Sequence, residues 1–199
     1  MISLAHLMTF LRIVLVPFFP IFYFWGSSFG IDEKVVPFIL LALLIVCQIS
    51  DILDGKFARR RNEVTDLGKV LDPMADSLLS LTVLFTFTTE PISLPVILIF
   101  VFLYREFSIL ALRLLCGLKG HALAARSSGK IKTVLQAAVF FLIVLLMIAN
   151  QWNIISLLQL QWTSFYAVLV AAFYTAISAC EYFYASRRFI FKSLNSKGK

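Results

Sequence analysis

The sequence has 199 residues, of which 60% are hydrophobic and 15% charged, and its mean hydropathy is +0.91. A soluble domain of this length needs more polar surface than this composition supplies, so the chain is predicted to be an integral membrane protein solvated largely by lipid. The formal net charge of +7 does not indicate a partner among the nucleic acids, because the basic residues gather on one predicted side of the membrane.

Six apolar stretches follow one another along the chain and predict an all-α fold of six transmembrane helices. They cover residues 8–30, 35–50, 77–89, 91–104, 133–150 and 154–180. A helix needs about 20 mostly apolar residues to cross a bilayer, and the first, fifth and sixth stretches meet that length. The other three reach it only by including charged flanks, at 51–59, 68–76 and 105–113. With no internal repeat, residues 1–199 are expected to form a single membrane domain.

The basic residues set the expected orientation. If the N-terminus is cytosolic and the chain crosses six times, every Lys and Arg except Lys34 falls on the cytosolic side, as the positive-inside rule requires. Both termini and all three charged flanks then face the cytosol. Ionisable residues within membrane helices are costly and are usually functional, so we expect the active site at this cytosolic interface.

Four aspartates at the ends of the second and third stretches are the strongest chemical signal. Asp51 and Asp54 are three residues apart, and Asp72 and Asp76 are four apart, so each pair shares one helical face. Such carboxylates would repel one another unless a cation lay between them. Mg²⁺ prefers oxygen ligands, and two such ions can stabilise both oxygens of a phosphoryl transfer. A structural alternative remains open, in which Asp72 caps a helix that begins at Pro73 and the first pair forms ion pairs with nearby basic residues.

The spacing of these residues resembles a known family. The pattern D-x2-D-G-x2-A-R-x8-G-x3-D-x3-D is similar to the signature of the CDP-alcohol phosphatidyltransferases. In this sequence it consists of Asp51, Asp54, Gly55, Ala58, Arg59, Gly68, Asp72 and Asp76.

The resemblance implies a six-helix membrane domain, usually a homodimer, that uses two Mg²⁺ (or Mn²⁺) ions. It implies that Asp51, Asp54, Asp72 and Asp76 are metal ligands and that Asp76 is also the catalytic general base. It further implies that the CDP group is bound by Asp51, Gly55, Ala58, Arg59 and Gly68.

A second group of basic residues lies between the fourth and fifth stretches. It comprises Arg105, Arg113, Lys119, Arg126, Lys130 and Lys132, with Glu106 among them. The positive-inside rule accounts for a basic loop, but less well for Arg105, Arg113 and Lys132 within apolar helices. An anionic substrate would account for them, because Arg and Lys bind phosphate strongly.

Four segments resemble one branch of the family, the bacterial phosphatidylglycerophosphate synthases. They read TFLRIVLVPFF, LDPMAD, YREFSILALRLL and GKIKT. The resemblance implies that CDP-diacylglycerol and glycerol 3-phosphate are the substrates, in a bacterial cytoplasmic membrane. It implies that Arg105, Arg113, Lys130 and Lys132 bind the acceptor phosphate, with Thr9 and Arg12 also near the site. Ser77 and His6 depart from the branch, which usually has Lys and Asn at these positions.

Two alternatives remain open at this point. The acceptor would be a different alcohol (inositol phosphate, phosphatidylglycerol, serine or choline) if the basic group does not bind a phosphate. From another class, a cation or solute transporter would also use membrane carboxylates.

Overall fold

The computed structural model describes the backbone of residues 4–61, 66–118 and 127–195, and the side chains of residues 8–53, 71–117 and 128–187. Within these ranges the protein is helical and has no β-strand, which confirms the predicted all-α class. The helices are α1 (Leu4–Leu15), α2 (Phe18–Trp25), the short 3-10 helix η1 (Ser27–Phe29), α3 (Val36–Arg61), α4 (Asp66–Thr86), α5 (Val96–Leu118), α6 (Ser127–Gln151) and α7 (Leu157–Asn195).

The first predicted stretch is divided into two helices at Pro17. Proline has no backbone N–H, and its ring clashes with the carbonyl group four residues earlier, so an unbroken helix is disfavoured there. The Val16 N–H still donates to the Arg12 carbonyl (3.0 Å), and the Ile21 N–H donates to the Pro17 carbonyl (3.3 Å). α1 and α2 therefore follow one path and together form a membrane-length segment.

Four segments of the described chain are long and apolar enough to cross a membrane: Met8–Trp25, Val36–Leu53, Ser128–Gln151 and Leu157–Arg187. They correspond to the first, second, fifth and sixth predicted stretches. α4 and α5 correspond to the third and fourth stretches and are not apolar enough to belong to this group. Each carries charged residues along the length that a crossing would use, such as Asp72 and Asp76 on α4 and Arg105 on α5.

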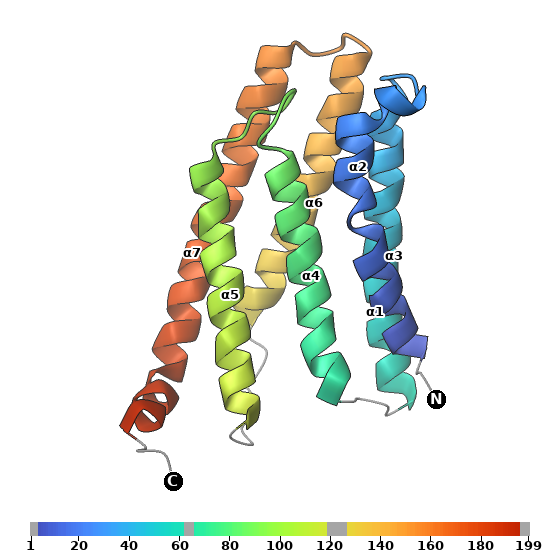
Figure 1. Cartoon of the computed structure of the whole chain (residues 1–199). Coiled ribbons are helices and arrows are strands. Elements are labelled where there is room, and N and C mark those ends of the chain that lie inside the picture. Colours follow the sequence, from blue (N-terminus) through green and yellow to red (C-terminus); the bar gives the residue numbers. More distant parts are fainter. Residues whose placement is uncertain (1–3, 62–65, 119–126, 196–199) are drawn as a thin grey trace.

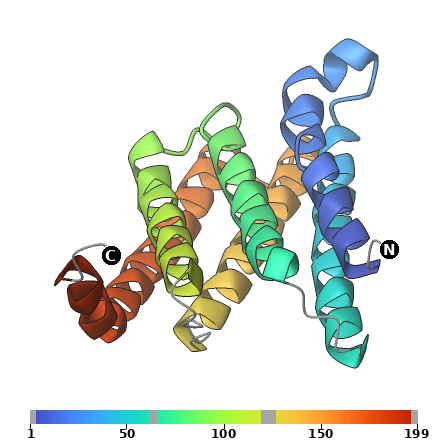
Figure 2. The same ribbon diagram turned by 60° about the horizontal axis from the view of Figure 1, so that its bottom comes forward.

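The long helices stand side by side in one bundle (Figure 1). α4 lies between α5 and α1 in both views, with α6 and α7 behind them in Figure 2. α1 packs against α3 and α4, while α7 packs against α5 and α6. α1 begins and α7 ends at the same end of the bundle, at the bottom of Figure 1, where α3 also ends and α4 begins.

Apolar side chains fill the centre of the bundle and also cover much of its outside. Phe87, directly after the end of α4, packs edge-on against Phe19 and Phe140, with ring centroids 5.9 and 6.5 Å away. On α7, Val170 and Phe173 are 60% and 71% exposed, although both are apolar. An apolar exterior of this extent is what lipid requires, and the structure agrees with an integral membrane protein.

Candidate active site

A buried arginine brings two of the predicted aspartates together. Arg12 of α1 is fully buried, and its Nη1 atom lies 3.0 Å from Asp51 Oδ1 on α3 and 2.6 Å from Asp76 Oδ1 on α4. Burying a guanidinium group is costly unless it is paired, and these two carboxylates provide the partners. The side chains of Asp51 and Asp76 remain 33% and 44% exposed, so both carboxylates are accessible to a ligand.

The third described aspartate is held by the same helix. Thr9 lies three residues before Arg12, on the same face of α1, and is buried. Its hydroxyl group donates a hydrogen bond of 2.8 Å to Asp72 Oδ1. The alternative in which Asp72 caps a helix beginning at Pro73 is wrong, because α4 already begins at Asp66 and continues through Pro73. α1 therefore contacts every aspartate of the motif whose side chain is described.

The remaining motif residues lie on the same two helices. The backbone of Asp54, Gly55, Ala58 and Arg59 continues α3 beyond Asp51, and Gly68 lies in the first turns of α4. Their side chains lie outside the described part of the chain, so the predicted CDP-binding contacts are not tested. Within the described part, no three His, Cys, Asp or Glu residues lie close enough together to hold a metal ion.

The described carboxylates nevertheless suit a hard divalent cation. Carboxylate oxygens are the preferred ligands of Mg²⁺ and Mn²⁺. Asp51 and Asp76 come from different helices and converge on one cationic nitrogen, so this pair already stabilises positive charge between two helices. The donor set and its convergence therefore fit a metal centre.

A cavity of about 170 Å³ opens beside Asp76, between α4, α5, α6 and α7. All four predicted phosphate-binding residues line it, namely Arg105, Arg113, Lys130 and Lys132. Positive charge from two helices thus gathers around one space, and Asp76 forms part of its wall. We call this space the basic cavity.

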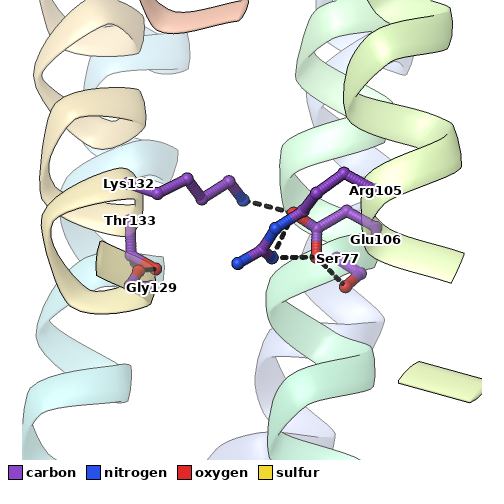
Figure 3. Close-up of polar contacts among 6 residues, drawn as sticks. All are labelled: Ser77, Arg105, Glu106, Gly129, Lys132 and Thr133. Atoms are coloured by element: carbon purple, nitrogen blue, oxygen red, sulfur yellow. Dashed lines mark hydrogen bonds and ion pairs between the residues drawn. The ribbon is translucent and has the colours of Figure 1, made fainter. Parts of the chain in front are cut away.

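Glu106 lies at the centre of the charged groups of the basic cavity, a position that the sequence did not reveal. Its carboxylate accepts hydrogen bonds from Arg105 Nη1, at 3.1 and 3.2 Å, and from Lys132 Nζ (Figure 3). The hydroxyl group of Ser77 donates to its Oε2 atom at 3.0 Å. All three charged groups are buried, so the carboxylate partly neutralises the two cations and fixes their position. The sequence indicated it only as a single acidic residue in an apolar helix whose other charged residues are basic.

α7 also contributes to the basic cavity, through Tyr182. The tyrosine is buried, and its ring centroid lies 5.9 Å from the guanidinium carbon of Arg105, which indicates a cation–π contact. Its hydroxyl group lies against Gly129, the third residue of α6, where a Cβ atom would come within 2.8 Å of Tyr182 Oη. Gly129 therefore permits α7 to approach the start of α6 at this point.

We expect Gly129→Ala to destabilise the protein by about 1–3 kcal/mol, because the added methyl group overlaps the hydroxyl group of a buried ring. Thermal unfolding in detergent measures the effect. Tyr182→Phe removes only the overlapping oxygen, and the next ring atoms would lie at least 3.5 Å from the new Cβ atom. Gly129→Ala should therefore cost much less in a Tyr182→Phe background. An equal loss of stability in both backgrounds would show that Tyr182 does not limit the size of the side chain at position 129.

Comparison with known proteins identifies the class to which this site belongs. The family model described as CDP-alcohol phosphatidyltransferase matches residues 2–177. The chain belongs to the CDP-alcohol phosphatidyltransferase family and is a transferase of phospholipid biosynthesis. This family generally uses divalent metal ions, in agreement with the donor set of the described aspartates.

Among its relatives are bacterial proteins named CDP-diacylglycerol–glycerol-3-phosphate 3-phosphatidyltransferase. The chain is 34% identical to the protein of Bacillus subtilis (strain 168) over 197 residues, which cover 92% of this chain and 94% of the relative. It is 30% identical to the protein of Rickettsia bellii over 189 residues, covering 94% and 97%. The identity to the protein of Treponema pallidum is 36% over 139 residues, covering 65% of this chain and 62% of the relative.

Proposed function

We propose that this enzyme transfers the phosphatidyl group of CDP-diacylglycerol to sn-glycerol 3-phosphate, giving phosphatidylglycerophosphate and CMP. The observation that carries the proposal is that Asp76 lines the same cavity as four basic residues. A carboxylate that can accept a proton and a site that can bind a phosphate dianion therefore lie within one small space. The names of the relatives support the same substrates.

In this mechanism the phosphate of the acceptor binds among Arg105, Arg113, Lys130 and Lys132. Asp76 accepts the proton of an acceptor hydroxyl group, and the oxygen attacks the phosphorus that carries diacylglycerol. The bond from that phosphorus to CMP breaks, and CMP leaves. Arg12 holds Asp76 in position throughout, because the two side chains form a 2.6 Å ion pair.

The other motif residues would serve the nucleotide side of the site. Two Mg²⁺ (or Mn²⁺) ions, held by Asp51, Asp54, Asp72 and Asp76, would supply positive charge to the diphosphate when bound. Gly55, Ala58 and Gly68 would let the cytidine group approach the helices, with Asp51 and Arg59 beside it. Thr9 supports this arrangement, because it orients Asp72 through a hydrogen bond.

The same proposal includes the membrane topology and assembly. We infer that residues 1–199 form one domain that crosses a bacterial cytoplasmic membrane six times, with α4 and α5 as the additional crossings. The termini and the site would face the cytosol, where both the basic residues and the soluble acceptor are found. We also infer a homodimer, which the mass of the protein in detergent, measured by light scattering, would test.

The direct test is CMP release by the purified protein in detergent with CDP-diacylglycerol and Mg²⁺. We expect release with glycerol 3-phosphate and not with inositol phosphate, phosphatidylglycerol, serine or choline, and we expect a chelator to abolish it. Arg113→Gln should raise the KM for glycerol 3-phosphate about 10-fold, because it removes one charged hydrogen bond to the phosphate.

Lys34→Gln is the matched control, since Lys34 is exposed, lies in the turn before α3 and does not line the basic cavity. Its KM should equal that of the wild type. Release driven by another alcohol would reassign the basic cavity to that acceptor. A folded protein without metal-dependent release for any acceptor would contradict the proposed reaction and leave a transport or a structural role for the aspartates.

A further inference from the structure

A second, smaller hollow also borders Asp76, next to the basic cavity. Its volume is about 40 Å³, and three residues line both spaces: Asp76, Ser80 and Thr133. Arg12 and Asp51 line the smaller hollow as well. A space of this size admits a hydroxyl group or a water molecule but not a nucleotide. The proposed general base therefore lines both a site for an anion and a site for a small polar group.

Gln136 of α6 is the unexplained residue of this hollow. It is 3% exposed, and neither its Nε2 nor its Oε1 atom has a hydrogen-bond partner among the described residues. A buried amide without partners is unfavourable, and folded proteins contain few of them. Gln136 lies four residues after Lys132, one helical turn further along the same face of α6. α6 thus presents a cation to the basic cavity and an unpaired amide to the adjoining hollow.

The chemistry of an amide matches that of a hydroxyl group. Both can donate and accept a hydrogen bond. The NH₂ group of an amide can donate to the oxygen of an alcohol, and the amide oxygen can accept from its hydroxyl hydrogen. Glycerol 3-phosphate carries a phosphate and two hydroxyl groups. In the proposed function the phosphate binds in the basic cavity and one hydroxyl group gives its proton to Asp76, which leaves the other hydroxyl group without a partner.

We propose that Gln136 is a specificity-determining residue whose amide binds the acceptor hydroxyl group that does not react. This inference rests on the proposed function, because it assumes an acceptor with a phosphate and two hydroxyl groups. Gln136 thereby lets the enzyme distinguish glycerol 3-phosphate from phosphates that carry a single hydroxyl group.

The test compares glycerol 3-phosphate with 3-hydroxypropyl phosphate, which keeps the phosphate and one primary hydroxyl group but lacks the second. We expect the wild type to prefer glycerol 3-phosphate by about 10- to 100-fold in kcat/KM, the loss that follows when a buried polar group is left unpaired. In Gln136→Met the preference should fall to within about 3-fold, mainly because the kcat/KM for glycerol 3-phosphate decreases. The rate with 3-hydroxypropyl phosphate should stay near that of the wild type.

Ser164→Ala is the matched control. Ser164 of α7 is also fully buried without a hydrogen-bond partner among the described residues, and it does not line either cavity. This variant should keep the full preference. Gln136→Met should unfold at a temperature no lower than the wild type, since it loses no hydrogen bond. If Gln136→Met does not fold, Gln136→Asn, which keeps the amide but withdraws it by one methylene group, should reduce the preference.

The possible outcomes distinguish a failure of the proposed function from a failure of the role proposed for Gln136. A wild type that releases no CMP with glycerol 3-phosphate contradicts the proposed function itself. A wild type that does so, together with a Gln136→Met variant that retains its preference, overturns the role of Gln136. An equal loss of activity with both acceptors would likewise overturn it, because it would indicate a structural role.

Discussion

Asp76→Asn is expected to lower kcat by about 10⁴-fold, the upper end of what a general base contributes. Asparagine has nearly the same shape as aspartate, but it cannot accept the proton of the attacking hydroxyl group and carries no charge. The upper end applies because the same carboxylate is proposed to hold a metal ion. CMP release from CDP-diacylglycerol with saturating glycerol 3-phosphate measures the effect.

The fold should survive this substitution. The Asp76 side chain is 44% exposed, and the Oδ1 atom of asparagine can still accept the hydrogen bond from Arg12 Nη1. The thermal midpoint in detergent should therefore remain close to that of the wild type.

Asp32→Asn is the matched control, since Asp32 is exposed and lines neither cavity, and its carboxylate accepts a hydrogen bond from the nearby Lys34 N–H that the asparagine oxygen can also accept. It should retain full activity. Substantial turnover by folded, purified Asp76→Asn protein would rule out Asp76 as the base.

Glu106→Leu is expected to have the largest effect on stability, about 3–5 kcal/mol, which is typical when one partner of a buried ion pair is removed. Arg105 and Lys132 would then lie next to each other in a buried position without the carboxylate that separates their charges. The Ser77 hydroxyl group would also lose its acceptor. Thermal unfolding in detergent measures the loss.

A double-mutant comparison distinguishes this electrostatic cause from a loss of packing. Adding Lys132→Met to Glu106→Leu removes one of the two unpaired cations, so the double variant should be more stable than Glu106→Leu alone. Glu33→Leu, at an exposed position in the turn before α3, should leave the thermal midpoint unchanged. If Lys132→Met adds a further loss instead, the charge argument for Glu106 is wrong.

The sequence by itself predicted the class of fold and the position of the chemistry along the chain. Composition and the length of the apolar stretches predicted helices in lipid, because a spanning segment must satisfy its own backbone hydrogen bonds. The spacing of Asp51 and Asp54, and of Asp72 and Asp76, predicted a shared helical face for each pair, since 3.6 residues per turn is a local property. The sequence also showed the charged flanks of α4 and α5, the two long helices that are not apolar enough to be counted among the membrane-crossing segments.

Only the tertiary structure decided which of those faces meet. Arg12 contacts Asp76 across 64 positions of sequence, and Thr9 contacts Asp72 across 63. Likewise, Glu106 joins cations from α5 and α6, and Tyr182 reaches the basic cavity from α7. Helical periodicity sets which way a side chain points from its own helix, but its partners depend on how the helices pack. That packing follows from the fit of many side chains at once, and so no short motif encodes it.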